Sequence, residues 1–197
     1  MNTVLDDSML LCLANGQRIK LRTQMRMLFE VADLLHASPA TVSRCGMVYM
    51  SASDLDWRSY VYSWMPRVFP DESILTDALK HHLLELFENK VDAALKLKEG
   101  PHLKEPLQTI KVQNLTNVCN ILEIFLDPEN KFQTKETFEK QTKYITNVFV
   151  FAFVWGFGGG LSHLAMEKFS DFVRHHFQRE VSIPIAETAF EYYMHNR

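Results

Sequence analysis

The chain has 197 residues, of which 47% are hydrophobic and 23% are charged, and its formal net charge is -3. This composition is typical of one or two globular domains, and the slight negative charge argues against nucleic-acid binding, which needs a basic surface. The most apolar stretch, residues 148–161, is shorter than the roughly 20 residues that span a bilayer, so we expect no membrane partner either.

A β-hairpin is predicted near the start of the chain. Two strand-like runs, residues 10–13 and 18–21, flank the pair Asn15-Gly16. Asn-Gly between such runs favours a tight turn, because both residue types tolerate positive φ. We therefore expect the two runs to pair with each other.

Two further strands and a short helix are predicted up to residue 50. Residues 25–31 and 47–50 are nearly continuous apolar runs, which are typical of strands buried on both faces of a parallel sheet. Between them, Ser38-Pro39 predicts a helix start, because serine can cap free amide groups and proline fits the first helical position. We expect this helix to stop at Gly46, so that the region forms part of a parallel α/β sheet.

The rest of the chain predicts a helical domain. Apolar residues recur at helical spacing, and proline or glycine separates several of the periodic segments. The expected helices cover residues 54–68, 73–98, 115–126, 134–155 and 162–177. We expect Asn114 to cap the third helix and the glycines within residues 156–160 to end the fourth. The chain after Arg179 is expected to be a connector whose structure depends on a partner.

Residues that could carry independent chemistry are scattered. The three cysteines show no CxxC spacing, which argues against a disulfide framework and a zinc site. Adjacent histidines, as in His81-His82, point about 100° apart on a helix and do not readily face one metal ion. The sequence contains no GxxxxGK[ST] phosphate loop. We expect no metal site and no complete enzyme site.

Arg44 leaves two interpretations open. It follows the helix that begins at Ser38-Pro39 and precedes the apolar run 47–50. An arginine there can stabilise the helix C-terminus through the helix dipole, by about 0.3–1 kcal/mol. Alternatively, a planar guanidinium on a rigid corner can contact a phosphate of a neighbouring module. The spacing alone favours the first interpretation.

The chain resembles the dynein heavy chain family, specifically the C-terminal half of its second AAA+ module. The stretches that carry the resemblance are NTVLDDSMLLCLANGQRIKL, MLFEVADL and ASPATVSRCGMVYM, followed more loosely by FVFAFVWGFGGGL and KFSDFVR. The resemblance implies part of a large α/β subdomain over residues 1–52, a helical small subdomain over 53–179 and a connector over 180–197. In the family a Walker B strand directly precedes NTVLDD, so both Walker motifs are expected to lie outside this chain.

The resemblance also implies an ATP-powered motor that moves on microtubules as a ring of AAA+ modules. The stretch WRSYVYSW is more similar to axonemal than to cytoplasmic dyneins, which implies the cytoskeleton of a cilium or flagellum. The implied partners are neighbouring modules of the same heavy chain, microtubules, and dynein intermediate and light chains. ATP and Mg are implied in the intact ring, whereas the isolated chain is expected to bind neither.

The resemblance gives Arg44 a role that its spacing alone does not. In this family the second module provides an arginine finger for the hydrolytic site of the first, and the finger position falls on Arg44. Its implied role is to stabilise charge on the γ-phosphate during hydrolysis. Ser38, Pro39 and Gly46 are implied to shape the corner that holds it.

The chain departs from the family pattern after the glycine-rich turn, where a sensor arginine often lies. Here the stretch AMEKF places Met166 near that position, and Lys168 is left as a weaker, non-forked nucleotide contact. Two functions stay open: a motor fragment, and a non-catalytic truncated protein that binds other dynein ring modules. An autonomous AAA+ ATPase is disfavoured, because both Walker motifs are missing.

Overall fold

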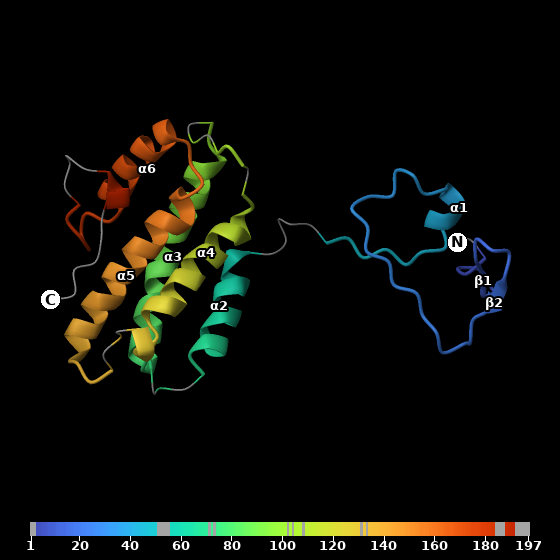
Figure 1. The fold of residues 1–197 in the computed structure, drawn as a ribbon, viewed down its shortest axis with the longest axis horizontal. Helices are drawn as coiled ribbons and strands as arrows, with labels where there is room; N and C mark the ends of the chain where they lie inside the picture. The colour runs from blue at the N-terminus through green and yellow to red at the C-terminus, as the bar shows by residue number, and fades with distance from the viewer. Residues whose placement is uncertain are drawn as a thin grey trace. The chain divides into compact units, whose positions relative to one another are not determined.

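The chain divides into two compact units, Met1–Asp54 and Leu55–Arg197. The computed structural model describes residues 3–50, 56–70, 72, 74–101, 103, 105–107, 109–130, 132, 134–183 and 188–191. The first unit contains a hairpin and one short helix, and the second is helical (Figure 1).

The hairpin of the first unit is confirmed. Strand β1 (Leu10–Cys12) pairs antiparallel with β2 (Arg18–Lys20). The turn between them contains Gly16 at φ 84°, a left-handed conformation that glycine adopts without steric cost. Asn15 adds a local contact, because its side-chain oxygen accepts a hydrogen bond from the Gln17 amide at 3.1 Å.

The predicted strands at residues 25–31 and 47–50 are wrong. Neither run forms a strand in the part of the chain that the structure describes, and their apolar side chains are exposed, with Leu28 at 96% and Tyr49 at 85%. A strand is stable only when its backbone groups pair with a neighbour, and the described residues of this unit provide none. Among the described residues of this unit, Val4 is the single hydrophobic residue that is buried. These residues therefore form no packed core that could hold the two apolar runs in place.

The five predicted helices of the second unit are present. Helix α5 contacts α3, α4 and α6, and α2 packs on α4 (Figure 1). The helices are α2 (Trp57–Val68), α3 (Asp77–Glu99), α4 (Lys111–Phe125), α5 (Phe138–Gly158) and α6 (His163–His176), with short 3-10 turns η1 (Pro128–Asn130) and η2 (Ala189–Glu191). Within the described residues, no helix combines the length and the apolar character that crossing a membrane requires.

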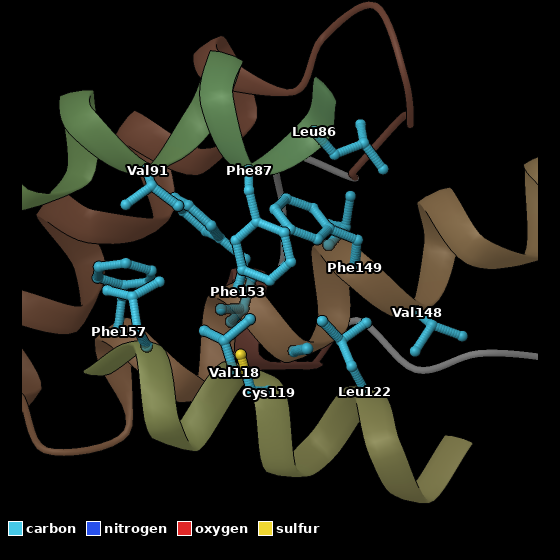
Figure 2. Packing of buried hydrophobic residues seen from close by; sticks show 14 of the residues in the cluster. Leu86, Phe87, Val91, Val118, Cys119, Leu122, Val148, Phe149, Phe153 and Phe157 are labelled. Atoms are coloured by element: carbon cyan, nitrogen blue, oxygen red, sulfur yellow. The ribbon is translucent and has the colours of Figure 1, made fainter. Parts of the chain in front are cut away.

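The core of this unit is built around α5. Figure 2 shows side chains of α3, α4 and α5 converging, including Phe87, Val118 and Phe153. Phe87 meets Phe149 edge-on with ring centroids 5.0 Å apart, and Phe153 lies 4.7 Å from Phe157. Such aromatic pairs add roughly 0.5–1.5 kcal/mol each beyond the area they bury. The apolar stretch of α5 is therefore the centre of a globular core.

The predicted start of α4 is wrong, whereas the glycine-rich stretch does end α5, three residues later than predicted. Helix α4 begins at Lys111 with Ile110 as its N-cap, so Asn114 lies inside the helix, where it is buried. Helix α5 continues through Gly156 and ends at Gly158, with Gly159 as its C-cap. Gly156 lies directly against Val118 of α4, and a larger residue has no room there.

Replacing Gly156 with alanine should destabilise the helical unit. The new Cβ atom would lie 2.4 Å from Val118 Cγ2 and 2.9 Å from the Val118 backbone nitrogen, so α4 and α5 would have to separate. Overpacking of this kind costs about 1–3 kcal/mol, which outweighs the gain in helix propensity of up to about 1 kcal/mol. Urea unfolding followed by circular dichroism measures the change.

Gly160→Ala is the matched control, because a Cβ atom there meets nothing within 4 Å. We expect it to change the free energy of unfolding by less than about 0.5 kcal/mol, as at most exposed sites. Equal effects of the two substitutions would show that the α4–α5 contact is not as close as described.

The described residues of the chain after α6 contact the helical unit. The Ala189 amide donates a hydrogen bond to Ser170 Oγ of α6 at 3.0 Å, and Ala189 is buried. Phe190 meets Trp155 of α5 edge-on at 5.4 Å between ring centroids. Part of the predicted connector therefore packs against α5 and α6.

Candidate functional site

The corner that presents Arg44 begins with a well-capped short helix, α1 (Pro39–Val42). Ser38 is the N-cap with an extended backbone, and its Oγ accepts a hydrogen bond from the Thr41 amide at 3.2 Å. The same Oγ lies 2.8 Å from Thr41 Oγ1. Pro39 occupies the first turn, where a backbone N–H would have no partner within the helix, so the lack of an N–H in proline costs no hydrogen bond. Ser38 and Pro39 thus start the helix as predicted.

The carbonyl groups at the end of α1 are satisfied by the residues that follow. Ala40 O accepts hydrogen bonds from Ser43 Oγ at 3.2 Å and from Arg44 Nη1 at 2.9 Å. Thr41 O accepts one from Cys45 Sγ at 3.2 Å. A helix leaves its last carbonyls without internal partners, so these contacts fix the chain direction after the helix.

Gly46 does not end the helix, contrary to the sequence prediction. Helix α1 ends at Val42 with Ser43 as its C-cap. Gly46 does not adopt positive φ, and a Cβ atom there would meet nothing within 4 Å. The side chains of Ser43 and Arg44 terminate the helix instead.

Arg44 is also tied to the NTVLDD stretch at the start of the chain. Its Nε donates a hydrogen bond to Asp6 Oδ1 at 2.8 Å, and this ion pair joins residues 38 positions apart. The side chains of Arg44 and Asp6 are 34% and 43% exposed. Arg44 therefore meets the structural requirement of each interpretation: it caps α1 through Ala40 O, and about a third of its side chain is accessible to an external anion.

Lys168 lies in the second unit, on the exposed face of α6. Within the described residues it makes no hydrogen bond or ion pair. Met166, at the position where the family often has an arginine, is partly buried against the hydrophobic core. Lys168 is thus free to contact an anion, whereas Met166 helps to close the core.

The described residues include no group of three or more His, Cys, Asp or Glu side chains that could hold a metal ion. All three cysteines are free, and burial raises the pKa of the Cys119 thiol. Burial lowers the pKa of His82, whose Nε2 lies 2.9 Å from Thr146 Oγ1.

A buried polar cluster in the second unit was not predicted from the sequence. Lys98, at the end of α3, forms an ion pair with Glu105, and the two side chains are only 9% and 12% exposed. The Lys98 Nζ also donates to Asn114 Oδ1 at 2.7 Å and to Phe157 O at 2.9 Å. Burial alone raises the pKa of Glu105, but bonds from Lys98 and Thr109 bring it below its ordinary value. The cluster joins α3, α4 and α5.

Asp6 was also missed, because the bond to Arg44 bridges 38 residues without a local signal. Its membership of NTVLDD, one of the stretches that carry the family resemblance, was the only hint.

Comparison with known proteins identifies one family. Residues 83–197 match the model of the dynein heavy chain AAA lid domain. Dynein axonemal heavy chain 6 of Homo sapiens is 37% identical over 182 residues, which cover 90% of this chain and 4% of that protein. Dynein axonemal heavy chain 11 of Sus scrofa is 37% identical over 206 residues, covering 100% and 4%. The dynein beta chain of the flagellar outer arm of Chlamydomonas reinhardtii is 32% identical, covering 98% and 4%.

Proposed function

This chain belongs to the dynein heavy chain family, and from that premise we propose that it is part of an axonemal dynein heavy chain. The observation that carries the proposal is the lid-domain match over residues 83–197, together with the axonemal and flagellar names of the relatives. The chain spans about 4% of the length of these relatives. It therefore contributes to ATP-driven movement on microtubules, in a cilium or flagellum, as one piece of a larger ring.

Within that ring we place the chain in the second AAA+ module. Residues 1–52 then belong to the large α/β subdomain, and the helices that follow form its lid. The placement rests on the resemblance of NTVLDD and ASPATVSRCGM to that module. The exposed apolar runs 25–31 and 47–50 support only membership of a larger domain, in which other parts of the parent chain would cover them. The immediate partners are neighbouring modules, while microtubules and intermediate and light chains are reached through the parent.

Arg44 serves as an arginine finger for the neighbouring module. Two features support the role: the guanidinium is anchored through Nε and Nη1, and about a third of the side chain is exposed. A fixed guanidinium can stabilise charge that develops on the γ-phosphate of ATP bound there with Mg. Lys168, exposed on α6, contributes a weaker contact to the nucleotide of its own module.

A chimeric motor tests the proposal. Residues 1–197 replace the matching segment of human dynein axonemal heavy chain 6, and the same heavy chain without the segment is the control. We expect the chimera to form a ring by electron microscopy and to drive microtubule gliding with ATP. A chimera that forms the ring but moves no microtubules would contradict the proposal.

A second candidate function is a non-catalytic protein that binds dynein ring modules on its own. The exposed apolar surface of residues 25–31 and 47–50, in a sequence without a phosphate loop, favours it. The purified chain should then bind isolated ring modules in sedimentation experiments and bind no ATP by calorimetry. ATP hydrolysis by the purified chain alone would contradict both candidates.

A further inference from the structure

Asp6 sits on a turn that is held by several hydrogen bonds. The Met9 amide donates to Asp6 O at 2.9 Å, and the Leu10 amide donates to Thr3 O at 2.9 Å. Thr3 Oγ1 donates to Leu10 O at 2.7 Å, and Ser8 Oγ donates to Thr3 O at 3.0 Å. The turn leads directly into β1, so the Asp6 carboxylate is presented from a braced backbone.

The contacts of Arg44 fix the orientation of its guanidinium plane. Nε is bound to Asp6 Oδ1 and Nη1 to Ala40 O, and these two acceptors come from opposite ends of the first unit's sequence. In the described part of the chain, Nη2 has no acceptor. Two of the three nitrogens are thus held, and the Nη2 edge is left for an external oxygen atom.

We propose that Asp6 is a positioning residue, which orients the Arg44 guanidinium toward the terminal phosphate of a nucleotide bound in the neighbouring module. The inference rests on the proposed finger role of Arg44 and identifies the residue that orients the finger. An arginine side chain has several rotatable bonds, and one anchor at Ala40 O leaves the plane free to turn; the second anchor removes that freedom before the phosphate arrives. Orientation of this kind matters in the transition state, where a 1 Å misplacement can cost about 100-fold in rate.

A competing effect of Asp6 is that its negative charge weakens the attraction between Arg44 and a phosphate. The carboxylate is 43% exposed, so water screens much of this effect. The hydrogen bond from Nε, in contrast, acts at 2.8 Å and has a fixed direction. The benefit of orienting the Arg44 guanidinium therefore outweighs the weaker electrostatic attraction between Arg44 and the phosphate.

The test uses a full dynein heavy chain that carries this segment and measures kcat and KM for ATP hydrolysis. The variants are Asp6→Ala, Asp6→Asn, Arg44→Ala and the double replacement. Asp7→Ala is the matched control, because Asp7 lies in the same turn and makes no bond to Arg44 among the described contacts. We expect Asp6→Ala to lower kcat roughly 10- to 100-fold with KM changed less than about twofold.

The other variants separate positioning from a structural role. Asp6→Asn keeps an oxygen that can accept from Nε and should restore part of kcat, and Asp7→Ala should behave as the unaltered protein. The double replacement should be no slower than Arg44→Ala, because Asp6 acts only through Arg44. A normal kcat in Asp6→Ala, or a further loss in the double replacement, would overturn the positioning role while leaving the finger in place. A normal kcat in Arg44→Ala would overturn the finger and the positioning role together.

Discussion

Arg44→Ala in the full heavy chain should lower ATP turnover by about 10³-fold or more. Arginine fingers in nucleotide hydrolases contribute factors of roughly 10³ to 10⁵, because they stabilise charge that is present mainly in the transition state. The structural loss is small by comparison, since the bond from Arg44 to Ala40 O at the end of α1 is partly exposed. Single-turnover hydrolysis, with nucleotide binding measured separately, shows whether the chemical step has slowed.

Two further variants make this result specific. Arg44→Lys keeps the positive charge, but its single ammonium nitrogen cannot occupy the separate positions from which Nε bonds Asp6 and Nη1 bonds Ala40 O while Nη2 faces a phosphate, so we expect little recovery. Ser38→Ala removes the N-cap of α1 at a cost of about 0.5–2 kcal/mol and leaves the guanidinium in place. Its turnover should fall less than about tenfold. Unchanged ATP turnover in Arg44→Ala would contradict the finger role.

The helices could be predicted from the sequence because their signals are local. Apolar residues at helical spacing place α3 and α6 within a few residues of their observed ends. Local signals also predict the hairpin turn at Asn15-Gly16 and the start of α1 at Ser38-Pro39. In each case the residues that decide the conformation lie within one or two turns of each other.

The errors arise where residues far apart in the sequence determine the local conformation. Asn114 has the side chain of a helix cap, but Lys98 from α3 binds it inside α4. Gly156 has the conformational freedom to end a helix, but α5 continues through it to Gly158, and Gly156 packs closely against Val118 of α4. The runs 25–31 and 47–50 are apolar enough for strands, yet a strand also needs a partner, and its own sequence does not reveal one.

The candidate site likewise contains one part that could be predicted from local sequence and one part that depends on a distant contact. The α1 corner was predictable, because Ser38, Pro39 and Arg44 lie within one short segment. Its second anchor was not, because Asp6 and Arg44 meet only in the folded unit. The finger role proposed for Arg44 rests on family resemblance, since its spacing alone favours stabilisation of the helix C-terminus.

Lys98→Ala should lower the free energy of unfolding of the helical unit by up to about 3–5 kcal/mol, the cost of removing one partner from a fully buried ion pair, because the Lys98 and Glu105 side chains are only 9% and 12% exposed. Lys98 also bonds Asn114, Phe157 O and Thr109. Its loss removes the donor to Phe157 O and leaves Asn114 Oδ1 with the longer bond from Thr109 Oγ1 at 3.3 Å. Lys111→Ala is the control: its bond to Glu99 is 2.6 Å long, but the side chains are 61% and 57% exposed. Such a surface pair contributes no more than about 1 kcal/mol.

The pH dependence shows whether the buried charge causes the loss. The pKa of Glu105 lies below its ordinary value of 4.5 in the folded protein, so the pair stabilises the fold above that pH, and this stabilisation is lost as the pH falls. Without Lys98, only the bonds from Thr109 oppose the effect of burial, so the pKa of Glu105 rises and the carboxylate becomes neutral at a higher pH than in the original protein. The difference in stability between the original protein and Lys98→Ala should therefore shrink as the pH falls through about 4.5. A constant difference from pH 7 to pH 4 in urea unfolding would instead assign the loss to the neutral contacts with Asn114 and Phe157 O.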